Sequence, residues 1–194
     1  VVTIQNINEN NLLQETVITE GVVTAVYNAF SDINGQPSFV IQNGTGPYSA
    51  IWCIGENVEI GDMVNIIGNV DEHYGLRHIA GGTVSILSNG NTLPEPEVLD
   101  SESMNDEQWE AVLIQSVGSV VEIVTGWGQW TISDADDNAP QPIPTCMVNS
   151  MGYEALNAVV DIDGVSYNFI ELGATYRVTG PNFYSYGNWK IAPR

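Results

Sequence analysis

One pattern of short segments occurs twice in this chain, once in each half. Gly21 interrupts a long β-branched run in the first half, and Gly118 interrupts a similar run in the second. Later segments also correspond, since Gly75–Ala80 (GLRHIA) matches Gly187–Ala192 (GNWKIA). Similarity at a fixed spacing is typical of a duplicated structural unit. The sequence therefore predicts two copies of one domain, which we place at residues 1–95 and 96–194.

The spacing between the copies changes at one point. From Gly61 to Ala80 the matching residue lies 112 positions further on, whereas Cys53 and Cys146, which fall at matching places, lie only 93 positions apart. The second copy therefore contains about 19 extra residues. We place this insertion near residues 147–169.

The repeated segments are short, rich in Val, Ile and aromatic residues, and separated by Gly, Pro, Asn and Asp. This is typical of antiparallel strands, and examples are Thr16–Tyr27, Ser38–Gln42 and Met63–Val70. Ser101–Glu110 starts with Ser and has acids in its first turn. That pattern predicts a short helix at the start of the second copy. The predicted fold class is all-β.

Each copy has five predicted strands, of which the first is long and contains the glycine. The main insertion falls between the third and fourth strands. This order favours a five-stranded Greek-key barrel of the OB type, in which a mid-strand Gly lets the first strand bend and serve both sheets. We therefore expect two tandem OB-fold-like barrels.

Acidic residues dominate the charge, with 24 Asp and Glu against 4 Lys and Arg, a formal net charge of −20. Such a field repels polyanions, and no basic stripe is present, so nucleic acid is predicted not to be a partner. No apolar run approaches the roughly 18 residues of a membrane span. Val at position 1 indicates a processed chain that has lost a secretory signal. These features predict an extracellular or cell-surface protein.

The chain resembles the tandem OB-fold modules of large secreted bacterial proteins, such as those beside extracellular nuclease domains and in surface proteins. In the first copy the resemblance is carried by Val2–Ile4, Glu20–Val23, Phe39–Gly46, Ile60–Asp62, Gly68–Val70 and Tyr74–Leu76. In the second copy it is carried by Glu107–Ile114, Leu172–Gly173 and Gly187–Ala192. These motifs specify turns and cores, so the resemblance implies a fold more than an activity.

The sequence contains no recognised catalytic motif. GxSxG, HExxH, P-loop, dinucleotide and CxxC patterns are all missing. Carboxylate pairs such as Glu154 and Asp161 are expected by chance among 24 acids. We therefore expect a protein that is not an enzyme and has no certain cofactor.

Aromatic residues gather in the second copy. Trp127 and Trp130 lie around its first-to-second-strand turn, and Tyr184, Tyr186 and Trp189 lie at its last hairpin. Because OB barrels that bind single strands or sugars stack their ligands on exposed rings, these five residues are the candidate ligand-binding set. A neutral glycan would escape the electrostatic penalty. The alternative is that Trp130 and Trp189 fill the barrel core while the tyrosines cover its rim.

Four oxygen-bearing residues stand in one turn of the second copy, namely Asp134, Asp136, Asp137 and Asn138. A hard cation such as Ca²⁺ favours this density of oxygen ligands. The Gly and distal Glu of an EF-hand loop are missing. Calcium binding and an ordinary polar turn both remain open.

The two cysteines, Cys53 and Cys146, permit one internal disulfide. In an oxidising compartment such a bond would clamp the two barrels together. The alternative is two buried free thiols that pack as small hydrophobic residues.

Two functional hypotheses follow from the sequence. The first is a secreted, non-catalytic structural or interaction protein whose partners are proteins, including copies of itself in a filament or surface layer. In this hypothesis a neighbouring subunit holds the polar opening segment 1–11 by strand exchange. The alternative is a ligand-binding accessory module, for glycan or single-stranded nucleic acid, of a secreted enzyme system.

Overall fold

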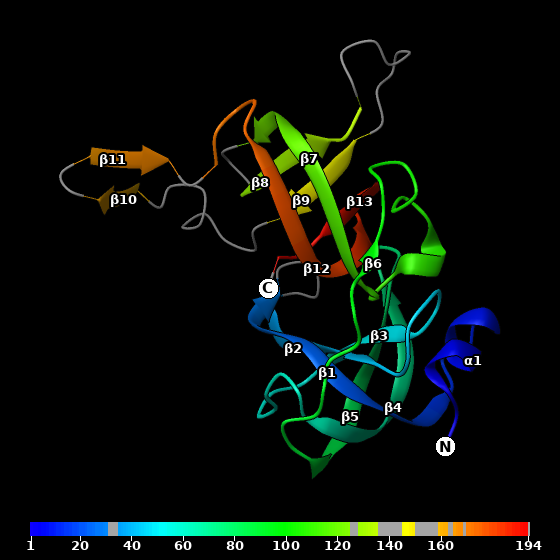
Figure 1. The fold of residues 1–194 in the computed structure, drawn as a ribbon. Coiled ribbons are helices and arrows are strands. Elements are labelled where there is room, and N and C mark those ends of the chain that lie inside the picture. Colours follow the sequence, from blue (N-terminus) through cyan, green and yellow to red (C-terminus); the bar gives the residue numbers. More distant parts are fainter. Residues whose placement is uncertain are drawn as a thin grey trace.

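Two five-stranded barrels stacked on one another make up the molecule (Figure 1). In the computed structural model the described residues are 1–30, 35–124, 128–135, 145–149, 159–162, 165–168 and 170–193. The first barrel closes in the order β1-β2-β3-β5-β4. The second has the equivalent order β7-β8-β9-β13-β12, and β12 pairs with β7 to close it. The predicted all-β fold with two tandem OB-fold-like barrels is confirmed.

The first barrel consists of β1 (Thr16–Phe30), β2 (Gln36–Gln42), β3 (Ala50–Ile54), β4 (Met63–His73) and β5 (Leu76–Ser88), preceded by α1 (Ile4–Glu9). The second consists of β7 (Leu113–Val124), β8 (Gln129–Ser133), β9 (Cys146–Asn149), β12 (Thr175–Ser185) and β13 (Asn188–Ile191), with a short β6 (Glu97–Val98) beside β7. In the predicted insertion, β10 (Val159–Ile162) and β11 (Val165–Asn168) pair as a separate hairpin. Of the short helix predicted at Ser101–Glu110, the structure has the three-residue 3-10 helix η2 (Glu107–Trp109), which Asp106 rather than Ser101 caps.

The opening segment folds onto its own barrel. Thr3 caps α1 by accepting a hydrogen bond from the Asn6 N–H on its hydroxyl. Ile4 and Ile7 are buried in the core of the first barrel, and the Val2 N–H donates to the Ile18 carbonyl at 2.7 Å. Because contacts within the chain satisfy this segment, the expectation that a neighbouring subunit holds it is wrong.

The glycines in the two long first strands occupy equivalent positions. A β carbon at Gly118 would lie 2.7 Å from the Ser133 carbonyl oxygen, and one at Gly21 would lie 3.1 Å from that of Gln42. Any side chain would therefore push the second strand away from the first. The glycine that revealed the repeat is needed for this close crossing.

The pairing of the third strands does not agree with the predicted correspondence between Cys53 and Cys146. Phe39 lies opposite Cys53, whereas Trp130, which takes the place of Phe39 beside the first strand, lies opposite Val148. The counterpart of Cys53 is therefore Val148, and Cys146 stands two residues earlier. The predicted correspondence of the cysteines is wrong because strand pairing, rather than residue identity, sets the register.

An apolar face of the first barrel is covered by the second. The fully buried Trp52 ring stacks on Phe30, with 4.4 Å between centroids, and meets the edge of Phe183 of β12 at 6.0 Å. The Trp52 indole N–H also donates to the Asn182 carbonyl at 3.4 Å. Phe30, Trp52 and Phe183 belong to one apolar cluster that extends through both barrels, while the first barrel has a separate core as well. The junction is therefore a continuous hydrophobic contact.

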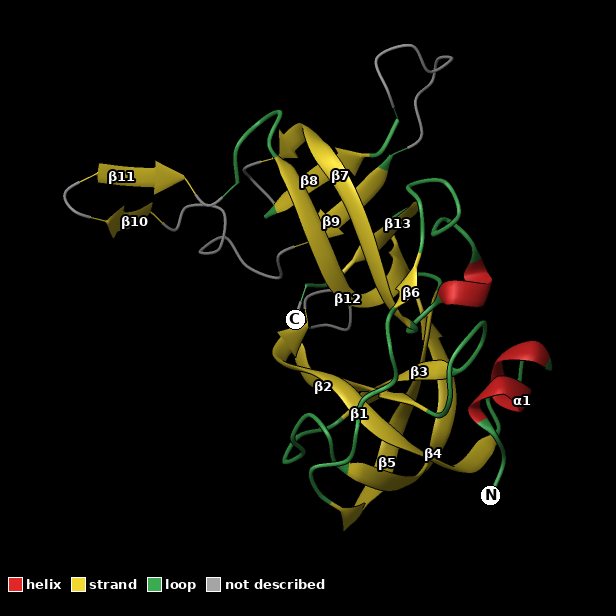
Figure 2. Ribbon diagram, in the orientation of Figure 1, coloured by secondary structure: helices red, strands yellow, loops and turns green. Residues whose placement is uncertain are grey.

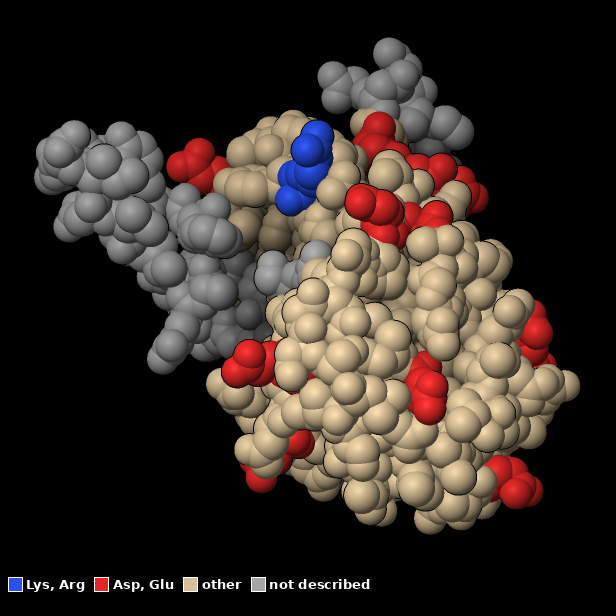
Figure 3. All heavy atoms as spheres, turned by 60° about the horizontal axis from the view of Figure 1, so that its bottom comes forward, with Lys and Arg blue, Asp and Glu red and all other residues tan. Residues whose placement is uncertain are grey.

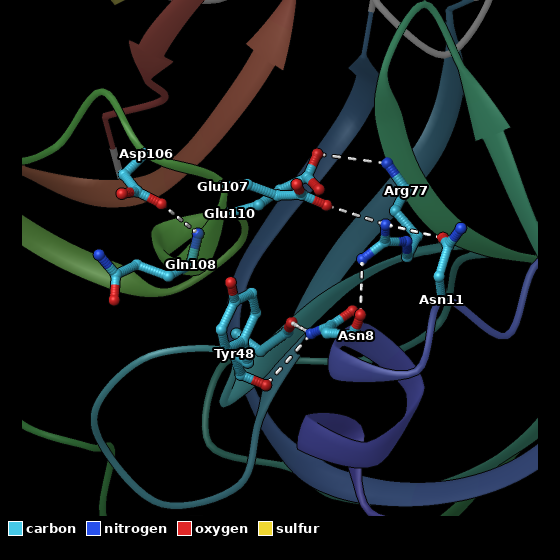
Figure 4. Close-up of polar contacts among 9 residues, drawn as sticks. Asn8, Asn11, Tyr48, Arg77, Asp106, Glu107, Gln108 and Glu110 are labelled. Atoms are coloured by element: carbon cyan, nitrogen blue, oxygen red, sulfur yellow. Dashed lines mark hydrogen bonds and ion pairs between the residues drawn. The ribbon is translucent and has the colours of Figure 1, made fainter.

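A polar network crosses the same junction beside α1 and η2, which lie on one side of the molecule (Figure 2). The buried Arg77 guanidinium forms an ion pair with Glu107 at 3.0 Å and donates to the Asn11 side chain at 3.0 Å (Figure 4). The Arg77 backbone N–H donates to the Glu110 carboxyl at 3.2 Å. The segment that enters the second barrel is thus fixed to the first.

Burial raises the pKa of Glu110 from an ordinary value of 4.5 to about 8, and the charges of Glu107 and Glu72 raise it further. The hydrogen bond and charge of Arg77 act in the opposite direction. Between these two pKa values the folded state holds a proton that the unfolded state has lost. The free energy of unfolding therefore falls as pH rises through this interval.

We predict that Glu110→Gln removes this part of the pH dependence, because the amide stays neutral at every pH. Urea denaturation at pH 5, 7 and 9 should show the variant gaining stability relative to wild type as pH rises. Glu102→Gln, at an exposed position, is the matched control and should not change the pH profile. A Glu110→Gln profile parallel to wild type would contradict a protonated Glu110.

We also predict that Trp52→Ala lowers the free energy of unfolding by about 3–5 kcal/mol, because it opens a cavity at the junction. Urea denaturation measures this change. Ile67→Ala, at a position 43% exposed on the first barrel, should cost at most about 0.5–1 kcal/mol. Equal effects of the two substitutions would show that the junction does not stabilise the molecule.

Candidate functional site

The barrel face that is covered in the first copy has an open counterpart in the second. The covered face is formed by five apolar residues of the shared cluster, Ala25, Val40, Ala50, Trp52 and Leu76. At the equivalent register positions the second barrel has Glu122, Thr131, Thr145, Met147 and Asn188. Both first strands have the same irregularity, directly before Ala25 and directly before Glu122, which supports this alignment. The duplicated face has changed from apolar to mostly polar.

All five of these second-barrel residues line one groove of about 750 Å³. The other lining residues among those described are Asn105, Val121, Gly187 and Trp189. The groove therefore lies on β7, β8 and β9 and against the β12–β13 hairpin. In OB barrels the face of the second and third strands, with the loop between the fourth and fifth, is where oligonucleotides and oligosaccharides bind.

Trp189 is the aromatic side chain among the described residues of the groove lining. It is half-buried, and its ring lies 5.1 Å from that of Tyr184 with a tilt of 56°. Its inner part packs against the apolar cluster. The packing fixes the indole while leaving part of it in the groove, so a flat ligand ring has a rigid surface on which to stack.

The lining is close to neutral. Among the described lining residues Glu122 alone is charged, and the amides of Asn105 and Asn188 each offer both donors and acceptors. The Arg77 and Lys190 side chains are buried, Arg177 is exposed, and Arg194 lies outside the described residues. Figure 3 shows one small basic area on its face and acidic groups distributed around it. The groove is therefore better suited to hydrogen bonds with the polar atoms of a ligand ring than to ion pairs with phosphates.

The structure separates the aromatic residues predicted for ligand binding. Trp189 lines the groove, Tyr184 packs beside it, and Tyr186 is 65% exposed at the hairpin tip. Trp130 is 3% exposed within the core, where its ring meets the edge of Tyr176. Trp127 lies outside the described residues.

The calcium prediction falls mostly outside the described part of the chain. Asp136, Asp137 and Asn138 are not among the described residues. Asp134 is described, and its carboxylate accepts from the Ser101 N–H at 3.3 Å while its own N–H donates to the Ser101 hydroxyl at 3.2 Å. Within the described residues no group of three or more His, Cys, Asp or Glu is arranged to hold a metal ion. Calcium binding stays a prediction.

The two cysteines are free and buried in different places. Cys53 belongs to the separate core of the first barrel, and Cys146 belongs to the cluster shared by the barrels. Burial raises the pKa of both thiols well above the usual range. The alternative of buried free thiols is confirmed, and the disulfide clamp is not formed.

The polar lining of the groove was not predicted from the sequence. Thr131 and Thr145 belong to no motif, Asn188 lies in the repeated segment Gly187–Ala192, and Asn105 lies in the predicted helix segment. A signal was present, because the repeat aligns Leu76 with Asn188. A polar residue at a position that is apolar in the other copy marks a face with a different role.

Comparison with known proteins gives similarities of fold. No family model matches the chain, and no curated protein matches it. A murine DNA-binding protein solved with double-stranded DNA matches at 13% identity over 92% of this chain and 95% of that one, with a TM-score of 0.44. The p202 HIN2 domain, solved as a tetramer, matches at 17% identity over 94% and 95%, with a TM-score of 0.40. The Ifi202 HINa domain, solved with a 20bp double-stranded DNA, matches at 16% identity over 94% and 93%, with a TM-score of 0.41.

These matches correct expectations drawn from the sequence. The resemblance to secreted bacterial OB modules is wrong, because the matching structures are a murine DNA-binding protein and HIN domains. The same matches contradict the expectations that depended on it, namely a secreted structural or filament-forming protein, an accessory module of a secreted enzyme system and an extracellular location. They also contradict the exclusion of nucleic acid as a partner.

The structure supplies physical reasons for these errors. Stacking of further copies would need a second apolar face like that of Trp52, and its counterpart is polar. Nucleic acid was excluded because of the net charge and the lack of a basic stripe, and both of these concern contacts with phosphates rather than contacts with bases. Among the described residues, no helix is long and apolar enough to cross a membrane.

Proposed function

We propose that this chain is a non-enzymatic protein that binds single-stranded nucleic acid on the open face of its second barrel. The observation that carries the proposal is the register comparison of the two barrels. The face that the first barrel uses for an internal apolar contact is, in the second, an open groove that offers hydrogen-bonding groups and the Trp189 indole. OB barrels hold single strands on this face.

The lining residues suit contact with bases. Trp189 offers a stacking surface, and stacking is worth about 1–3 kcal/mol per base. Asn105 and Asn188 can each donate to and accept from the edge of a base, and the Glu122 carboxylate can accept from an exocyclic amine. Met147 and Val121 add apolar surface beside these groups. The groove therefore provides the two kinds of contact that recognise an unstacked base.

The charge of the protein determines how the strand lies. Phosphates gain little from a groove in which Glu122 is the one charged residue of the described lining, so the bases face the protein and the backbone faces solvent. Without the usual phosphate contribution we expect affinity on the order of micromolar or weaker.

The first test is binding of an unstructured oligothymidine of about twelve nucleotides, followed by anisotropy of a labelled strand. We predict that Trp189→Ala lowers affinity about tenfold and that Asn188→Ala lowers it less, because each removes a contact to a base. Leu172→Ala, at a position 69% exposed and outside the groove, is the control. Circular dichroism checks that each variant folds. Binding of a neutral polysaccharide in place of the oligonucleotide, or unchanged affinity in Trp189→Ala, would overturn the proposal.

Salt provides an independent test. Binding through phosphates weakens steeply between about 50 and 200 mM salt because counterions are released. Here salt screens repulsion between the acidic protein and the strand, so we predict that affinity rises over this interval. Repeating the titration across the range measures the sign of the slope. A steep fall in affinity with salt would show that phosphate contacts, rather than base contacts, hold the ligand.

A further inference from the structure

Two tyrosines occupy equivalent tips of the last hairpins in the two barrels. Tyr74 precedes Gly75 between β4 and β5, and Tyr186 precedes Gly187 between β12 and β13. Both tyrosines have left-handed backbone conformations, with φ of 50° and 48°. A bulky residue in this conformation is strained, whereas Asn or Gly would avoid the strain. The turns alone do not account for tyrosine at both tips.

The two tips meet at the junction of the barrels. The rings of Tyr74 and Tyr186 stack with 5.2 Å between centroids and 28° between planes, yet the residues are 61% and 65% exposed. The Lys190 ammonium lies 5.7 Å from the centre of the Tyr186 ring, and it donates to the Ser185 hydroxyl at 2.9 Å. The pair is therefore a supported, outward-facing aromatic surface that exists only when both barrels are present.

This surface is continuous with the groove. Gly187, directly after Tyr186, lines the groove together with Asn188 and Trp189. On the other side, the Tyr184 ring that packs beside Trp189 lies so close to Gly75 that a β carbon there would stand 2.6 Å from it. Aromatic rings thus extend from the groove to the stacked tips.

We propose that Tyr74 and Tyr186 form a second base-stacking subsite, and that a bound single strand extends from Trp189 onto this pair. The inference rests on the proposed function, because it takes the strand in the groove as the ligand. It adds that the first barrel, whose own OB face is covered, contributes to binding through the tip of its last hairpin. A strand must then exceed the length that fills the groove before it reaches both subsites.

The test compares oligothymidines of about four and about twelve nucleotides, the range covered by single OB barrels. Tyr74→Asn and Tyr186→Asn remove the rings while keeping a residue that tolerates the left-handed backbone. We expect each to lower affinity for the long strand about fivefold or more and to leave affinity for the short strand unchanged. Trp189→Ala should weaken both strands. Tyr48→Asn is the matched control, because Tyr48 also has a left-handed backbone, with φ of 60°, and lines a different cleft.

The outcomes separate the inference from the proposed function. If both strands bind through Trp189 with equal affinity, or if the tip variants weaken both strands equally, the second subsite is wrong while the groove proposal stands. If neither strand binds, the proposed function is wrong and the subsite with it. A selective loss for the long strand in both tip variants, absent in Tyr48→Asn, supports the subsite.

Discussion

Burial of the Trp52 indole between the barrels is the contact on which the rest of the molecule depends. The second barrel supplies the Phe183 edge and the Asn182 carbonyl to a side chain with no exposure. The strand that supplies both is β12, and its hairpin with β13 also supplies Asn188 and Trp189 to the groove. The contacts that hold the two barrels together at the junction therefore also hold one wall of the groove in place.

Duplication gave the same face to both barrels, and each uses it differently. In the first, Trp52 and Leu76 complete a contact within the chain. In the second, Met147 and Asn188 stand at those positions and border the groove. A barrel that is held firmly by its neighbour can leave its own face polar and open, because stability does not require that face to be buried. The groove is thus a consequence of the asymmetry between two similar domains.

The sequence was sufficient for the fold, because the repeat and the mid-strand glycines Gly21 and Gly118 depend on local spacing. The sequence did not predict the features that depend on which residues pair between strands. Cys146 was matched to Cys53 by identity, although the ladder places it two residues away from the equivalent position. The helix α1 was not predicted because its two buried isoleucines stand among polar residues in the sequence. Of the candidate ring residues, Trp189 reached the groove and Trp130 entered the core, a difference that depends on which side of a strand faces inward.

The two apolar cores imply an order of assembly. The first barrel has a core of its own, completed by the helix α1 and by strands that end at Ser88. The core of the second is continuous with residues that the first presents at its surface. During synthesis the first barrel can therefore fold as soon as its last strand has left the ribosome, and the second then forms on a surface that already exists.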